Sequence, residues 1–172
     1  MSRVKLFILT CFFFPFSYAS TFVVSNTNDS GIGSLRAEID SASEGDTIRF
    51  RNNLISNANA KISLNSEIAI DKSLTIIGLY NKQDTLFVSG RDRNRIFSIS
   101  SCDYVVLYSM FLIEGKSTWS FGGAITIRDS LSSIIIRNSF FKDNWARGNG
   151  GAIHAICSPD SLATGKIEVV NS

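Results

Sequence analysis

Short apolar runs recur along the whole chain, separated by polar or glycine-containing turns. Each run is only three to five residues long, and several alternate large apolar residues with small or polar ones, as Ile125-Thr126-Ile127 does. Such alternation predicts strands with one buried face. Strands this short are unusual in a β-sandwich, where about five or six residues is typical, and they suit the narrow faces of a β-helix. The predicted strands are 21–24, 47–50, 62–64, 68–70, 74–77, 86–88, 96–99, 104–108, 110–113, 124–127, 133–136, 152–155 and 167–170.

The tetrapeptide Gly-Gly-Ala-Ile occurs at 122–125 and again at 150–153, so the two copies start 28 residues apart (150 minus 122). A fixed period in this range is typical of a solenoid. One unit of strand, turn and glycine corner cannot bury its apolar edge alone, whereas stacked copies can. The predicted structural residues of this repeat are Gly122, Gly123, Ala124, Ile125, Phe141, Asn144, Gly150, Gly151, Ala152 and Ile153.

Four of the strongest strands superpose when they are aligned at their final small residues. These residues are Gly78, Ser109, Ser139 and Ser172, with spacings of 31, 30 and 33. A drift of a few residues is what turn insertions cause when strand positions are fixed. The pattern predicts an all-β fold, a right-handed parallel β-helix over 47–172 with about four or five coils stacked at roughly 4.8 Å.

The segment 20–46 has a different character and predicts an N-terminal cap. After a first strand and a polar cluster, Leu35, Ile39 and Ala42 fall on one helical face, and Ser34 is placed to be the N-cap. The open end of a β-coil exposes unpaired backbone and apolar side chains, which must be covered. A short amphipathic helix at this position would supply that cover.

Residues 1–19 predict a secretory signal peptide. Arg3 and Lys5 are followed by an apolar run from Leu6 to Phe16 and by the small residues of Ser17-Tyr18-Ala19. The run is too short to span a bilayer, which takes roughly 20 residues. Cleavage after Ala19 would leave a secreted chain, destined for the cell surface or outer membrane.

Without that segment the chain carries no net charge, because two of its 17 basic residues and none of its 15 acidic residues lie there. A neutral chain without a basic cluster argues against electrostatic binding of nucleic acid or anionic lipid. In an oxidising compartment Cys102 and Cys157 would be 55 residues apart, nearly two repeats. Two strand spacings of ~4.8 Å exceed the roughly 7 Å limit between Cα atoms of a disulfide. Free thiols or intermolecular bridges are therefore predicted.

The last strand, 167–170, repeats the one that leads into Phe140-Phe141-Lys142-Asp143-Asn144, and the chain then stops without a polar capping element. Because a solenoid needs such a cap, we expect a fragment or truncated reading frame. A natural stop with a frayed end is the alternative.

The motifs resemble those of a known family. Phe141-Lys142-Asp143-Asn144 matches the F-x-x-N tetrapeptide, and the two Gly-Gly-Ala-Ile copies match the G-G-A-I/L/V tetrapeptide, of chlamydial polymorphic membrane proteins. The segment 21–36 is similar to the start of many secreted bacterial β-helix proteins. The preceding coil has Phe111-Leu112-Ile113-Glu114 in place of a second F-x-x-N, and the family's C-terminal membrane barrel is missing. The resemblance implies a surface-displayed adhesin passenger, associated with a membrane only through such a barrel or another anchor.

The repeat residues themselves favour a structural role. Glycine pairs permit positive φ and close backbone approach at a corner, and Asn144 can hydrogen-bond turn backbone or stack on asparagines of neighbouring coils. For contact with a glycan or protein on a host cell or other surface, the predicted residues are Lys142, Asp143, Trp145 and Arg147, because an aromatic among charges resembles an interface anchor.

A polysaccharide-cleaving β-helix enzyme is the alternative function. Its chemistry needs paired carboxylates, or a carboxylate cluster holding calcium, on one face of successive coils. Under the alignment above the acidic residues do not fall in one column: Asp71, Asp103, Glu114, Asp129 and Asp143. The run Arg91–Arg95 predicts a solvated loop or a contact for an acidic glycan, and His154 predicts turn or surface packing. No catalytic residue, cofactor or metal ligand is predicted, and a non-functional remnant of a larger surface protein is a third reading.

Overall fold

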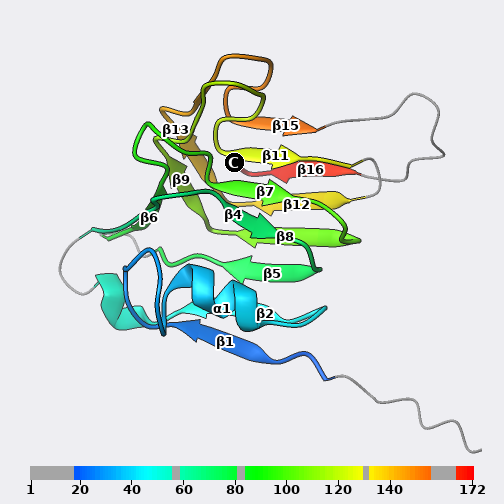
Figure 1. Ribbon diagram of the computed structural model, residues 1–172. Helices are drawn as coiled ribbons and strands as arrows, with labels where there is room; N and C mark the ends of the chain where they lie inside the picture. Colours follow the sequence, from blue (N-terminus) through cyan, green and yellow to red (C-terminus); the bar gives the residue numbers. More distant parts are fainter. Residues whose placement is uncertain (1–17, 56–58, 81–83, 130–131, 156–165) are drawn as a thin grey trace, which may run out of the picture.

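The chain winds into a parallel β-helix whose coils stack along one axis (Figure 1). The computed structural model describes residues 18–55, 59–80, 84–129, 132–155 and 166–172. Each coil passes in turn through a six-stranded sheet and two four-stranded sheets, and every strand pairs in parallel with the equivalent strand of the next coil. The predicted parallel β-helix is therefore confirmed.

Within each sheet the strands are ordered as they occur along the chain, and strands of the other sheets lie between them in sequence. The six-stranded sheet contains β1 (Thr21–Val24), β2 (Thr47–Phe50), β5 (Leu74–Ile77), β8 (Tyr104–Tyr108), β12 (Ser133–Arg137) and β16 (Ile167–Val170). The second sheet contains β3 (Ala60–Ser63), β6 (Leu86–Ser89), β9 (Phe111–Ile113) and β13 (Phe140–Lys142). The third contains β4 (Ile68–Ile70), β7 (Phe97–Ile99), β11 (Ile125–Ile127) and β15 (Ile153–Ala155). A two-stranded sheet joins β10 (Lys116–Ser117) to β14 (Trp145–Ala146), and the helical elements are α1 (Leu35–Ser41) and the 3-10 helix η1 (Asn52–Ile55).

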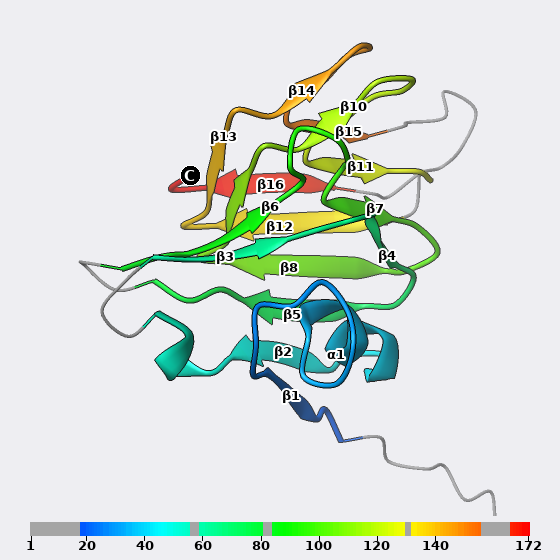
Figure 2. The ribbon, with the colours of Figure 1, turned by 60° about the vertical axis from the view of Figure 1, so that its left-hand side comes forward.

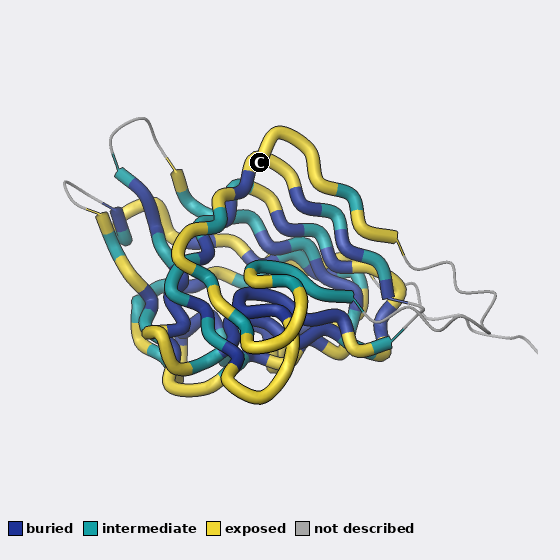
Figure 3. Tube along the Cα trace, turned by 90° about the horizontal axis from the view of Figure 1, so that it is seen from above, coloured by how far each residue is buried: buried dark blue, intermediate teal, exposed yellow. Residues whose placement is uncertain are grey.

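The core is a set of apolar columns that run along the stack. Ile48, Ile76, Leu107 and Ile136 pair in sequence across β2, β5, β8 and β12, and all four are fully buried. Their neighbours along each strand point outward, which produces the banded pattern of burial in Figure 3. Burying each such side chain contributes roughly 1.5–3 kcal/mol, so stacking supplies the energy that one coil lacks.

The predicted register is correct for two of the three strand pairs and wrong by one residue between β8 and β12. Tyr108 pairs with Arg137, so Ser109 lies opposite Asn138 and not opposite Ser139. Backbone conformation, not side-chain size, sets this alignment, because Ser109 and Asn138 both adopt a positive φ, at 52° and 51°. The shift carries into the next sheet, where Phe111 pairs with Phe140, and Leu112 takes the place opposite Phe141. A one-residue error of this kind exchanges the inner and outer faces of a strand.

The helix α1 forms as predicted. Ser34 Oγ accepts a hydrogen bond from the Ala37 N–H at 3.2 Å, and Leu35 and Ile39 are buried. Figure 2 shows α1 at the N-terminal end of the stack, below β4 and β5, where it covers the end of the coil. The cap therefore closes one end of the apolar core.

Arg36 fastens this cap to the first coil. Its guanidinium donates to the carbonyls of Glu67 and Ser66 at 2.9 and 2.8 Å and to Asp29 Oδ1 at 2.9 Å. The Asn65 N–H donates to the same Asp29 oxygen at 3.1 Å. Burial raises the pKa of Asp29, but the bonds from Arg36 and Asn65 and the charge of Arg36 outweigh it, so the pKa lies below its ordinary 3.8. The ionised carboxylate is therefore the form that the folded state stabilises.

Asp29→Asn is expected to lower the free energy of unfolding at pH 7 by about 1–2 kcal/mol. Because the folded pKa of Asp29 is depressed, its stabilisation is complete above the unfolded pKa and is lost as pH falls through the folded pKa. The variant should thus differ most from the wild type at neutral pH and converge with it as pH falls below the depressed folded pKa of Asp29. Urea titrations between pH 2 and 7 measure this. Asp71→Asn, at a side chain 71% exposed, should show neither effect, and equal behaviour of the two variants would contradict the role of Asp29.

Two predictions fall on residues outside the described ranges. Residues 1–17 of the predicted signal peptide lie there, and so does Cys157. Cys102 is a buried free thiol in β-helix turn 100–103, and burial raises its pKa. Within the described part of the chain, no helix is long and apolar enough to cross a bilayer.

Candidate functional site

The glycine pairs form corners between the second and third sheets. Gly122 and Gly150 have φ of 66° and 70°, which favours glycine at the first position. The second position is limited by close approach: the Gly123 N–H donates to the Gly151 carbonyl at 2.8 Å. A Cβ added at Gly123 would come within 3.0 Å of backbone atoms of both Gly151 and Trp145, whereas one at Gly151 would lie 3.3 Å from the Asn144 carbonyl oxygen. The two copies thus differ in how tightly they are packed.

Asn144 joins its coil to the preceding one. Its Oδ1 accepts from the Gly115 N–H at 2.8 Å, and its Nδ2 donates to the Leu112 carbonyl at 3.0 Å. The predicted bonding to turn backbone is confirmed, but the residue that faces Asn144 in the preceding coil is Gly115 and not a second asparagine. Asn94 performs a similar function two coils earlier, donating to the Leu64 carbonyl at 3.2 Å. The F-x-x-N pattern does not reveal it, because the turn before Asn94 is longer.

Residues 116–121 and 142–147, which we call the turn surface, lie on the outside of two successive coils. Lys116 pairs with Trp145, and the Arg147 N–H donates to the Ser117 carbonyl at 2.9 Å. The Lys116 ammonium lies 5.6 Å from the centre of the Trp145 ring, a cation–π contact. Trp145 is half exposed and Trp119 is 89% exposed. The turn surface therefore presents two indole rings beside cationic side chains.

The four predicted contact residues all belong to the turn surface. Lys142, Asp143, Trp145 and Arg147 are exposed. The Lys142 ammonium lies 3.7 Å from the Asp143 carboxylate, and both side chains are more than 60% exposed. Solvent screening makes such a pair worth little to stability, so it leaves both groups available. Sequence reasoning missed Lys116 and Trp119, because the short strands β10 and β14 carry no apolar alternation.

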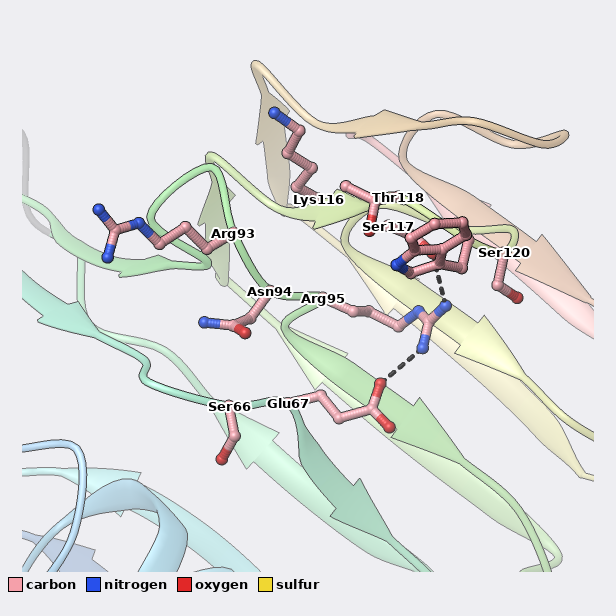
Figure 4. A pocket seen from close by; sticks show the side chains of 10 residues that line it. Ser66, Glu67, Arg93, Asn94, Arg95, Lys116, Ser117, Thr118 and Ser120 are labelled. Atoms are coloured by element: carbon pink, nitrogen blue, oxygen red, sulfur yellow. Dashed lines mark hydrogen bonds and ion pairs between the residues drawn. The ribbon is translucent and has the colours of Figure 1, made fainter.

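A groove of about 370 Å³ lies next to the turn surface, between the turn that leads into β7 and the turn that follows β10 (Figure 4). Arg95 forms its floor and is only 7% exposed. The guanidinium donates to the carbonyls of Gly122 and Phe121 at 2.8 Å, to Ser117 Oγ at 3.0 Å and to Glu67 at 2.5 Å. Arg95 therefore holds three segments of chain in place. The prediction of a solvated loop at 91–95 is wrong for this residue, because every polar group of its side chain has a partner within the fold.

The walls of the groove carry an excess of positive charge. Arg93, Arg95 and Lys116 line it, with Glu67 as the one carboxylate among its lining residues. Both oxygens of Glu67 are occupied, because Arg128 donates to Oε1 at 3.0 Å while Arg95 holds Oε2. Figure 4 shows Arg93 and Lys116 extending outward while Arg95 points back toward Glu67. The groove thus offers an anionic ligand an exposed cation, Arg93, and a half-buried one, Lys116.

Two carboxylates do lie in one column, contrary to prediction. Ile113 pairs with Lys142, so Glu114 and Asp143 follow at equivalent positions of successive coils, each with positive φ. The correct register produces this alignment. Glu114 accepts from Ser89 Oγ at 2.5 Å and from the Lys61 ammonium at 3.4 Å. The Ser89 bond, with the charge of Lys61 acting in the same direction, lowers the pKa of Glu114. A general acid needs the opposite shift.

His154 and the outer aromatic residues have packing roles. The His154 ring stacks on Phe121 with the ring centres 4.4 Å apart, as surface packing predicts. Nδ1 of His154 is buried and has no hydrogen-bond partner among the described residues. Along the second sheet, Phe111 contacts Phe87, Phe140 and Tyr80 with ring centres 6.0, 5.8 and 5.4 Å away. Such offset and edge contacts are favourable beyond the area that they bury.

Among the residues that the structure describes, no three His, Cys, Asp or Glu side chains gather into a group able to hold a metal ion. Comparison of the chain with known protein families, with curated proteins and with solved structures finds no match.

Proposed function

We propose that this chain is an exported, non-catalytic protein that attaches to a surface-borne glycan or protein, in the manner of an adhesin or autotransporter passenger. The observation that carries the proposal is the turn surface, where Trp119, Trp145 and Arg147 stand exposed beside the half-buried Lys116 on two hydrogen-bonded coils. Exposed Trp and Arg side chains of this kind are typical of the residues that dominate binding energy at interfaces. The proposal agrees with the resemblance to chlamydial polymorphic membrane proteins.

The scaffold suits this role because it holds the turns rigidly. The corner glycines, Asn144 and Arg95 are committed to bonds or close contacts between coils. Side chains presented from such a frame lose little conformational entropy on binding. Repetition of similar turns along a stack also allows several weak contacts to act together.

The state of the carboxylates supports binding without catalysis. Glu67 is held by two arginines, and Glu114 by Ser89 and Lys61. A glycosidase needs one carboxyl group that keeps its proton and a second that is free to act as nucleophile or base. Cleavage of a polysaccharide nevertheless remains the second candidate function, because Glu114 and Asp143 occupy one column.

The start of the described chain supports export. The backbone nitrogen of Ser20 donates to Asp46 Oδ1 at 2.6 Å, and Asp46 is almost fully buried. Cleavage after Ala19 would convert this amide into an α-ammonium group. The same nitrogen would then make a charge-assisted bond to the carboxylate, which is stronger than the neutral one.

Trp145→Ala combined with Arg147→Ala is expected to weaken attachment of the protein to cultured epithelial cells by about tenfold or more, since each truncates an exposed anchor. The far-ultraviolet circular dichroism should not change, because both side chains are exposed. Fluorescently labelled protein retained on the cells measures the effect.

Tyr104→Ala combined with Arg49→Ala is a matched control, because it removes an exposed aromatic residue and an exposed arginine from the six-stranded sheet. This variant should attach as the wild type does. If both variants attach equally well, the turn surface is not the attachment site.

A further inference from the structure

We propose that the groove above Arg95 binds an acidic oligosaccharide, with Arg93 and Lys116 holding its carboxylate or sulfate groups and Trp119 supporting a sugar ring. The inference builds on the proposed function, since it names the ligand class of a groove that shares residues 116–120 with the turn surface. It requires three properties of the groove: cations free to bind an anion, an aromatic platform and neutral hydrogen-bonding groups.

The cations come from adjacent turns and lie along the stack. The Lys116 N–H donates to the Asn94 carbonyl at 2.9 Å, and the Trp145 N–H donates to the Gly115 carbonyl at 2.8 Å. Arg93, Lys116 and Trp145 therefore belong to three successive hydrogen-bonded turns. Arg93 is exposed, and although its backbone N–H donates to the Gly90 carbonyl at 3.1 Å, its guanidinium makes no hydrogen bond or ion pair within the described residues. Its guanidinium is thus free to form a bidentate bond with a carboxylate or sulfate.

Arg95, the floor of the groove, prevents the Glu67 carboxylate from cancelling the positive charge of Arg93 and Lys116. Arg95 and Arg128 together occupy both oxygens of Glu67, so the one carboxylate among the described residues that line the groove is already neutralised. The three lining cations exceed the single lining carboxylate by two charges (three minus one). In a chain with no net charge outside residues 1–19, this local excess selects for an anion.

The remaining lining groups favour a saccharide over other anions. Trp119 is 89% exposed, and a flat aromatic face can stack on the apolar face of a sugar ring. Thr118, Ser120 and Asn94 line the same groove and offer neutral donors and acceptors to sugar hydroxyl groups. A nucleic acid would need a longer track of cations along its phosphates, and Arg93 and Lys116 alone do not provide one.

The test measures binding of the protein starting at Ser20 to four probes by isothermal titration calorimetry. They are hexagalacturonate, which carries carboxylates, a heparin hexasaccharide, which carries sulfates, neutral cellohexaose, and a six-nucleotide oligothymidylate. We expect one or both acidic saccharides to bind at least about tenfold more tightly than cellohexaose and the oligothymidylate. Affinity should fall as salt rises from about 0.1 to 1 M, because the Debye length shortens from about 10 to about 3 Å.

Arg93→Ala with Lys116→Ala should weaken binding of the acidic saccharide by at least about tenfold, since a hydrogen bond to a charged group is lost at each site. Arg93→Lys with Lys116→Arg, which keeps both charges, should retain most of the affinity. Arg49→Ala, an exposed arginine on β2, is the control for net charge and should bind as the wild type does. Unchanged affinity of the double alanine variant would overturn the proposal, and so would equal binding of cellohexaose or the oligothymidylate.

The outcome is separable from that of the proposed function. Unchanged saccharide affinity of the Arg93→Ala with Lys116→Ala variant, in a protein that attaches to cells, would reject the groove but keep the attachment role. Saccharide binding by a protein that attaches to no cell surface would keep the groove and reject the attachment role.

Discussion

Gly123→Ala is expected to destabilise the fold by about 3 kcal/mol or more, the upper end for an overpacked site. The added Cβ would lie within 3.0 Å of the Gly151 carbonyl oxygen and 2.6 Å from the Trp145 carbonyl oxygen. Both are backbone atoms of the next coil, so neither can rotate away. Relief requires the coils to separate, which breaks the bond between the Gly123 N–H and the Gly151 carbonyl. Urea unfolding followed by circular dichroism measures the loss as a lower midpoint.

Gly151→Ala is the matched control, because it changes the equivalent glycine of the other Gly-Gly-Ala-Ile copy. Its added Cβ would lie 3.3 Å from the Asn144 carbonyl oxygen, its one close neighbour, and its φ is not in the left-handed region. We expect a change in unfolding free energy of less than about 1 kcal/mol. Equal destabilisation by the two substitutions would show that corner conformation matters more than contact between coils.

Arg95→Ala should cost about 3–5 kcal/mol, as removal of one partner from a buried ion pair does. The substitution leaves the carbonyls of Gly122 and Phe121 and one oxygen of Glu67 without their donor. Arg95→Lys should restore little of the loss, because a lysine ammonium cannot reproduce the planar fork of donors.

Arg93→Ala is the control for this substitution, two residues away in the same turn. Because Arg93 is exposed, its removal should change the unfolding free energy by no more than about 0.5 kcal/mol. Guanidinium or urea titration of Arg95→Ala, Arg95→Lys and Arg93→Ala measures these changes in unfolding free energy. If Arg95→Ala is as stable as Arg93→Ala, the floor of the groove does not hold the coils together.

The architecture could be predicted from the sequence because parallel β-coils repeat the same apolar columns. Alternation at 74–77 and 104–108 identifies strands whose inward residues are Leu74, Ile76, Val105 and Leu107, all fully buried. The short length of the strands excluded a sandwich. The cap helix was predictable for the same reason, since Ser34 and the apolar face that follows it satisfy local rules for a helix start.

The register between β8 and β12 could not be predicted from side-chain size. The left-handed residue that ends each strand is Ser109 in one coil and Asn138 in the next, and serine gives little sign of positive φ. The error concealed the column of Glu114 and Asp143 and the alignment of Phe111 with Phe140. The backbone conformation of single residues sets the register and both alignments, and amino-acid composition encodes this conformation only weakly.

The candidate site was predictable only in part. Trp145 and Arg147 stand out in the sequence as an aromatic among charges, and the structure places them on an exposed turn. Arg95 and Arg93 look alike within the run 91–95, yet one is buried and bonded to three segments while the other is exposed. The two arginines differ because Arg95 contacts residues more than 20 positions away in the sequence. No local sequence pattern predicts such contacts.

The proposed role is attachment to a surface ligand without cleavage of that ligand. Incubation of the protein starting at Ser20 with cultured epithelial cells, followed by measurement of bound protein and of polysaccharide fragments released into the medium, tests both parts together. We predict saturable binding with no more fragments than in a sample without protein. Release of fragments that increases with time would contradict the account and would assign a catalytic role to the column of Glu114 and Asp143.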